Sequence, residues 1–183
     1  MKEVVIVVDM VRGFHDLGNL ANPRVARIIP NVVKLIKNQR SEGCEIIFLK
    51  DCHEPNDEEF KMFPPHCVWC TEETDLVDEL RGVQLLGDSI ILKTRYSGFY
   101  GTCLDRVLRI CDTETVILVG VCTDICILHT AADLRNRGYE VIVPLNCVET
   151  FDAPGHPADE TAQWAIKHMT DILGVKIVTT GAF

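Results

Sequence analysis

Six short apolar runs alternate with stretches of helical periodicity along this chain, and this alternation constrains its fold more than any other feature. The runs are rich in β-branched residues and lack polar alternation, which is typical of strands buried on both faces. They cover residues 3–8, 45–49, 89–92, 115–120, 139–143 and 175–179. The pattern predicts an α/β fold, with three α/β/α layers and a mainly parallel six-stranded sheet.

Four segments between these runs carry apolar residues at helical spacing. The clearest is 24–40, where Val25, Ile28, Ile29, Val32, Leu35 and Ile36 form one face. Gly43 follows it as the expected terminator. The other segments are 101–111, 123–137 and 158–172, the last of which precedes Gly174. No repeat, low-complexity segment or flexible linker interrupts the alternation, so we expect one domain over residues 1–183.

Length and composition narrow the class of protein. With 183 residues, 47% of them hydrophobic, the chain can bury a full core as one domain. No run approaches the roughly 18 apolar residues that a membrane span needs. The start, MKEVVIVVDM, has only a short apolar run before Asp9 and no small-residue cleavage site, so we expect no signal peptide. These features predict a cytoplasmic protein with no membrane partner.

Charge and cysteine content limit the partners. A formal net charge of −9 without a block of Lys or Arg disfavours nucleic acid, so a small-molecule ligand fits better. The nine cysteines are an odd number, which argues against a complete disulfide framework, and in a cytoplasmic protein they stay reduced. The oligomeric state stays open, a homo-oligomer included.

Residues that follow the apolar runs are the first candidates for a site, because ligands bind beyond the carboxyl ends of parallel strands. The candidates are Asp9, Phe14, Lys50, Asp51, His53, Lys93, Cys122 and Cys126. Each type has a simpler interpretation. An Asp there can form a turn or a cap, a Lys is usually solvated, and a Cys in an apolar stretch is usually a small buried hydrophobe. Cys44, Cys103, Cys111 and Cys147 fit that last description.

Cys126 differs from these cysteines by its position. The residues up to Cys122 end an apolar run, and Thr123 or Asp124 can N-cap the helical segment that follows. Cys126 then lies in the first helical turn, where free N–H groups and the helix dipole favour a thiolate and lower the pKa of the thiol. A nearby Lys93 would lower that pKa further. Cys122 lacks this placement.

The stretch GVCTDICILHTAADLRNRGYEV (120–141) resembles the signature of the isochorismatase-like cysteine hydrolases, roughly G-V-x-T-D-x-C-V followed by a T-A-x-D-A helix. The likeness extends through VVIVVDMVRGF (4–14), LKDCH (49–53), FPPHC (63–67) and KTRYSGFYGT (93–102). The resemblance implies that Cys126 is the nucleophile, Asp9 the catalytic acid and Lys93 the catalytic lysine. It also implies a cis peptide before Cys122, which would let the backbone amides of Cys122 and Cys126 form an oxyanion hole.

A second set of polar residues lies in DCHEPNDEEFKMFPPHCVWC (51–70). Asp51 and His53 are spaced by one residue, so their side chains point the same way on extended chain, and His66 follows two prolines. One carboxylate and two imidazoles suit a divalent metal such as zinc, iron or manganese, with water completing the shell. A loop with solvated acids and a capping histidine is the alternative.

The order D-x-H then P-P-H-C resembles the metal motif of the nicotinamidase branch of this family, where the metal binds the pyridine nitrogen of nicotinamide. The resemblance implies Asp51, His53, His66 and Glu59 as ligands, zinc first among the metals, and leaves Glu58 and Asp57 open as replacements for Glu59. It matches Phe14, Phe63 and Tyr96 with residues that pack on the ring, and it implies hydrolysis of nicotinamide to nicotinate and ammonia. The chain departs from the branch at its opening DMVRGF, usually D-x-Q-N-D-F, and at Cys70, usually glycine.

Two alternatives of different kinds stay open. Cys52, Cys67 and Cys70 with His53 or His66 could form a closed structural zinc site in a non-catalytic module, since C-x-x-C is a known ligand pair. That alternative leaves the catalytic set unexplained. Alternatively, the same catalytic residues could act on another small amide, such as a carbamoyl or ureido compound. Isochorismatases proper generally lack the nucleophilic cysteine, so Cys126 disfavours isochorismate as the substrate.

Overall fold

The strands pair in parallel in one sheet, with the order β3-β2-β1-β4-β5-β7 and with β6 beside β4. The computed structural model describes residues 2–179, and within them the strands are β1 (Glu3–Val8), β2 (Glu45–Asp51), β3 (Ser89–Lys93), β4 (Thr115–Val121), β5 (Glu140–Pro144), β6 (Val148–Glu149) and β7 (Lys176–Val178). The predicted three-layer fold is confirmed. The described part of the sheet has seven strands rather than six, because β6 is too short to leave an apolar run in the sequence.

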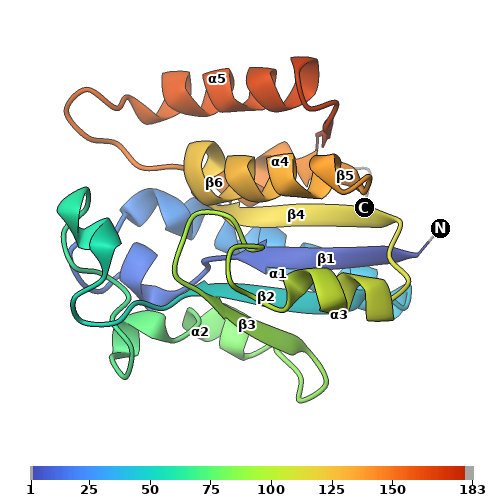
Figure 1. The fold of residues 1–183 in the computed structure, drawn as a ribbon, viewed down its shortest axis with the longest axis horizontal. Helices are drawn as coiled ribbons and strands as arrows, with labels where there is room; N and C mark the ends of the chain where they lie inside the picture. The colour runs from blue at the N-terminus through green and yellow to red at the C-terminus, as the bar shows by residue number, and fades with distance from the viewer. Residues whose placement is uncertain (1, 180–183) are drawn as a thin grey trace.

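Helices cover both faces of the sheet (Figure 1). The helices α1 (Ile29–Ser41) and α2 (Asp78–Arg81) pack on one face, and α3 (Leu104–Ile110), α4 (Leu128–Asn136) and α5 (Ala158–Asp171) pack on the other. Alternate residues of the strands supply the two apolar clusters between the layers; Phe48 belongs to the first cluster and Leu49 to the second. None of the helices described is long and apolar enough to cross a membrane.

Three predicted helices begin later than expected, among them 123–137, where a π-helical turn over Thr123–Ile127 precedes α4. The segment 24–40 is a 3-10 turn over Pro23–Arg27 followed by α1, which starts at Ile29 because Pro30 lacks an N–H and fits the first helical turn. The segment 101–111 becomes helical only at Leu104. The helix expected over 158–172 agrees with α5, and Gly43 ends α1 in the left-handed region as predicted. The four-residue α2 is too short to show periodicity and was not predicted.

A close approach of β1 and β4 places the first catalytic candidates side by side. Gly120 pairs with Val8 and has a φ of +118°. A Cβ at Gly120 would lie 2.0 Å from the carbonyl oxygen of Val8, so only glycine fits there. The chain then turns sharply after β1, where Asp9 adopts a φ of +52° and its amide donates to the carbonyl of Leu49 at 2.9 Å. Asp9 therefore leaves β1 beside the end of β4, because Val8 and Gly120 are the last pair of the two strands.

Candidate active site

The side chain of Lys93 joins the three residues predicted to be catalytic. Lys93 ends β3, and its side chain is 1% exposed. Its Nζ lies 2.8 Å from Oδ2 of Asp9 and 3.5 Å from Sγ of Cys126. Nζ also donates to Oδ1 of Asp51, its register partner on β2, at 2.9 Å. One ammonium therefore contacts a carboxylate, a thiol and one member of the second polar set.

Burial and charge set the protonation states of these groups. Burial alone would lower the pKa of Lys93, but the carboxylates of Asp51 and Asp9 raise it well above its ordinary value, so the amine stays charged. Burial raises the pKa of Asp9 to about 6 against the opposing effect of Lys93. Asp9 is therefore a base whose pKa lies close to neutral pH.

The predicted lowering of the pKa of Cys126 is wrong. Burial raises the pKa of this thiol well above its ordinary value, and the favourable charge of Lys93 does not overcome that effect. Asp9 and Asp51, which are negative, raise it further. In the resting site Cys126 is thus a neutral thiol that needs a base before it can attack.

The predicted N-cap at Thr123 or Asp124 is also wrong. Cys126 lies in a π-helical turn, Thr123–Ile127, which we call the cysteine turn, and no side chain caps its start. The side chain of Asp124 turns away to Thr150 and His156 instead. The peptide bond between Val121 and Cys122 is cis, as the resemblance implies.

The second polar set gathers into one buried cluster beside Lys93. Ligand atoms of Asp51, His53, Glu59 and His66 all lie within 4.8 Å of one another, and the four residues are buried. The Nε2 atoms of His53 and His66 lie 2.9 Å and 3.2 Å from Oδ2 of Asp51. Glu58, by contrast, is exposed and pairs with Lys61.

A hydrogen bond behind His66 and an ion-pair contact behind His53 orient the two imidazoles. Nδ1 of His66 lies 2.8 Å from the carbonyl oxygen of Pro64, so it carries the proton and leaves Nε2 free to act as a ligand. Nδ1 of His53 lies 3.3 Å from Oδ2 of Asp57, which is itself held by Arg95 at 2.7 Å. Asp57 therefore supports a member of the cluster from behind and is not part of it.

The donor set fits a divalent metal. Two imidazoles and two carboxylates suit zinc, and they suit iron or manganese as well. Oε2 of Glu59 is buried and has no hydrogen-bond partner among residues 2–179, as expected of an atom reserved for a cation. The thiols of the alternative zinc site are not in this cluster, and Cys70 is exposed. The cluster is therefore a candidate open metal site rather than a thiolate-rich closed one.

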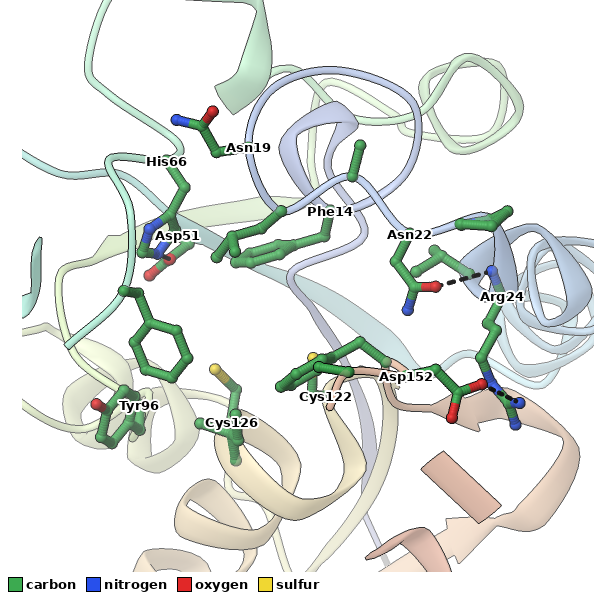
Figure 2. Close-up of a pocket in the computed structure, with 18 of the residues that line it drawn as sticks. Phe14, Asn19, Asn22, Arg24, Asp51, His66, Tyr96, Cys122, Cys126 and Asp152 are labelled. Atoms are coloured by element: carbon green, nitrogen blue, oxygen red, sulfur yellow. Dashed lines mark hydrogen bonds and ion pairs between the residues drawn. The ribbon is translucent and has the colours of Figure 1, made fainter. Parts of the chain in front are cut away.

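A pocket of about 440 Å³ connects the cluster to the thiol. Its lining includes Asp51, Glu59, His66, Cys122 and Cys126, together with the three aromatic residues predicted to hold a ring, Phe14, Phe63 and Tyr96. Figure 2 shows Cys126 between Asp51, His66 and Tyr96 on one side and Asn22, Arg24 and Asp152 on the other. Lys50, which alternates to the other face of β2, is not among the lining residues.

Sequence reasoning missed two parts of this site. Phe60 packs on both imidazoles, with ring centroids 5.3 Å from His53 and 5.5 Å from His66. Residues 19–25 and 151–153 form the far wall of the pocket. Residues 19–22 and 151–153 carry no periodic signal, and Asn22 and Asp152 within them are equally typical of turns. Arg24 and Val25 fall in the predicted helical segment 24–40, whose periodicity does not indicate that they line a pocket.

A comparison with protein-family models finds one that matches nearly the whole chain. The model of the isochorismatase domain matches residues 3–181. The chain belongs to the isochorismatase family. Three solved structures are similar to this chain over nearly their whole length. N-carbamoylsarcosine amidase from Thermoplasma acidophilum shares 32% identity and a TM-score of 0.88, covering 100% of this chain and 99% of its own.

The other two structures carry nicotinamidase or pyrazinamidase names. Pyrazinamidase/nicotinamidase from Streptococcus mutans UA159 is 32% identical with a TM-score of 0.87, covering 97% of this chain and 100% of its own. Pyrazinamidase of Pyrococcus horikoshii, solved in complex with zinc, is 33% identical with a TM-score of 0.85, covering 98% of this chain and 99% of its own. The family predicted from the sequence motifs is therefore confirmed for this isochorismatase-like hydrolase.

Proposed function

We propose that this hydrolase is an amidohydrolase that converts nicotinamide to nicotinate and ammonia through a thioester on Cys126. The observation that carries the proposal is the position of Lys93, which links the pair formed by Asp9 and Cys126 to Asp51 of the buried cluster. An amide carbon above the thiol and a ring nitrogen at the cluster could therefore be held by one small molecule. The nicotinamidase and pyrazinamidase names of similar structures support this substrate class.

The first half of the proposed reaction forms the thioester. Asp9 takes the proton from Cys126, and the thiolate attacks the amide carbon while Lys93 holds both groups by its charge. The carbonyl oxygen becomes an oxyanion that accepts hydrogen bonds from the amides of Cys122 and Cys126. Asp9 then returns the proton to the nitrogen, the C–N bond breaks and ammonia leaves.

The second half regenerates the enzyme. A water molecule gives a proton to Asp9 and attacks the thioester carbon, and the C–S bond of Cys126 breaks. Nicotinate is released and the thiol recovers its proton from Asp9. Each proton thus moves through the carboxyl group of Asp9, whose pKa is raised to about 6.

The substrate ring is held by aromatic packing and by the buried cluster. Phe63 lies between the ring edges of His66 and Tyr96, with centroid distances of 6.2 Å and 6.4 Å. A planar ring entering between these groups and Phe14 would lose water on both faces. A divalent metal held by Asp51, His53, Glu59 and His66 would act as a Lewis acid that takes the pyridine nitrogen as a ligand and orients the ring.

The substrate class is tested by ammonia release. The purified, metal-loaded protein should release ammonia from nicotinamide and from pyrazinamide, each of which presents a ring nitrogen, and release far less from a ureido amide. A second candidate, hydrolysis of a carbamoyl or ureido amide, is favoured by the likeness to N-carbamoylsarcosine amidase. Faster turnover of the ureido amide than of nicotinamide would replace the first proposal with the second.

The pKa of Asp9 sets an acid limit on turnover. Below about pH 6 Asp9 takes up a proton and can no longer accept one from Cys126. We expect kcat/KM to fall about tenfold for each pH unit well below that value. The measurement is kcat/KM for nicotinamide between pH 4.5 and 8, with metal content determined at each pH because imidazole ligands also bind protons. If kcat/KM stays constant down to pH 5 while the metal is retained, Asp9 is not the base.

A further inference from the structure

Asp124 links the cysteine turn to the part of the pocket wall formed by residues 151–153. Its Oδ1 accepts a hydrogen bond from Oγ1 of Thr150 at 2.5 Å, and its Oδ2 lies 2.9 Å from Nε2 of His156. Asp124 sits two residues from both Cys122 and Cys126. A displacement of its carboxylate would therefore move the backbone that carries the candidate nucleophile and oxyanion hole.

His156 is the last residue of a loop over residues 150–156, which we call the wall loop. The wall loop follows β6, and its residues Phe151, Asp152 and Ala153 line the pocket. An antiparallel bridge between Ala153 and His156 closes the loop, with N···O distances of 3.1 Å and 2.8 Å. The imidazole also stacks on the ring of Phe151, with centroids 4.0 Å apart and planes at 3°. The position of His156 therefore sets the position of the pocket wall.

Both ring nitrogens of His156 face oxygen acceptors. Nε2 faces the carboxylate of Asp124, and Nδ1 lies 2.9 Å from the carbonyl oxygen of Phe151. A backbone carbonyl can only accept, and an ionised carboxylate can only accept, so both nitrogens must carry protons for both bonds to exist. The arrangement is that of an imidazolium. In the neutral ring one of the two contacts becomes a repulsion between lone pairs.

The surrounding charges agree with this protonation state. Asp124 is the one ion-pair partner of His156 among residues 2–179, whereas Glu149 and Asp152, nearby along the chain, bind Arg24. Burial lowers the pKa of His156, but the bonds to Asp124 and to the carbonyl of Phe151 more than offset that effect and raise the pKa above its ordinary value of 6.5.

We propose that Asp124 and His156 form a protonation-dependent clamp that fixes the wall loop to the cysteine turn and so sets the affinity of the pocket for substrate. Both are positioning residues, since neither touches the reacting atoms. Because the pKa of His156 is raised on folding, the clamp's contribution to stability is complete below about pH 6.5 and is lost as the pH rises through the raised value. Above that pH the wall should loosen, and KM should rise more than kcat falls.

NMR tests the clamp without any substrate. At 20.5 kDa the protein is within reach of amide and imidazole titrations. We expect His156 to titrate above pH 6.5, the amides of Cys122 and Phe151 to follow with the same midpoint, and Asp124→Asn to lower that midpoint. His156→Gln should abolish the response of both amides. His168→Gln is the matched control, because His168 also stacks on an aromatic ring, that of Trp164, away from the pocket.

Kinetics give the second readout, and this arm rests on the proposed function. In the wild type KM should rise about fivefold through the titration of His156, whereas His156→Gln should show the high KM at every pH, because a coupling of about 1 kcal/mol corresponds to about a fivefold change. His168→Gln should behave as the wild type. The proposed clamp is contradicted if His156 titrates while the amide shifts of Cys122 and Phe151 do not change with pH. It is also contradicted if His156→Gln keeps the wild-type pH dependence of these shifts and of KM. Should no amide be hydrolysed, the proposed function fails, and the NMR titration still decides the clamp.

Discussion

Replacing Cys126 by serine should lower the hydrolysis of nicotinamide by about 10⁴-fold or more, which is the scale of losing the nucleophile in a concerted catalytic set. A serine hydroxyl binds its proton far more tightly than a thiol, and Asp9, with a pKa of about 6, is too weak a base to remove it. Lys93 would still hold Asp9 in place, so the fold and the pocket should be preserved. Ammonia release and circular dichroism on the same sample measure the two effects.

Cys122→Ala is the matched control for this prediction. Cys122 also lines the pocket and lies in the same segment as Cys126, but the proposed mechanism uses only its backbone amide. This variant should keep most of the wild-type activity. An active Cys126→Ser variant together with an inactive Cys122→Ala variant would reverse the assignment of the two thiols.

Replacing His66 by alanine should have the second largest effect. The imidazole lies at the centre of the site, 3.2 Å from Asp51 through Nε2 and 5.6 Å from the ring of Phe14 by centroids. Its loss removes one proposed ligand and one wall of the ring site. We expect metal affinity to fall by at least about 100-fold, since even changes behind the ligands commonly cost 10- to 100-fold. Metal content after dialysis should fall, and KM for nicotinamide should rise with it.

Cys70→Ser is the control that separates an open metal site from a thiolate-bound one. Cys70 is exposed and lies outside the buried cluster, so this variant should retain its metal and its activity. The opposite pattern, in which Cys70→Ser loses the metal and His66→Ala keeps it, would favour the structural zinc site built on Cys67 and Cys70.

Much of the framework could be predicted because it follows from local patterns. Buried parallel strands leave apolar runs, and polar residues at the carboxyl ends of these strands lie at one edge of the sheet, as Asp9, Asp51 and Lys93 do. Glu59 could be selected over Glu58 only by its likeness to a motif. The structure supplies the physical reason, since the short 3-10 turn Glu58–Lys61 turns Glu59 inward and leaves Glu58 at the surface.

The remaining features depend on contacts between distant segments. Asp124 has the residue type of an N-cap, but its partners Thr150 and His156 lie 26 and 32 residues further along the chain. The pKa of Cys126 follows the burial created by the whole fold, which outweighs the helix-terminus effect visible in the sequence. The wall residues 19–22 and 151–153 come from loops that contact distant segments, as Asn19 does with Pro65 and Asn22 with Thr150.

The most direct test of the proposed function is the ratio of kcat/KM for nicotinamide to that for benzamide, measured on the metal-loaded wild-type protein. The two amides have the same shape and differ in the ring nitrogen that we propose is held by the cluster of Asp51, His53, Glu59 and His66. We expect a ratio of about 100 or more, since a site built to bind a polar group discriminates strongly against an analogue that lacks it. A ratio near one would contradict the proposed role of the cluster in orienting the substrate.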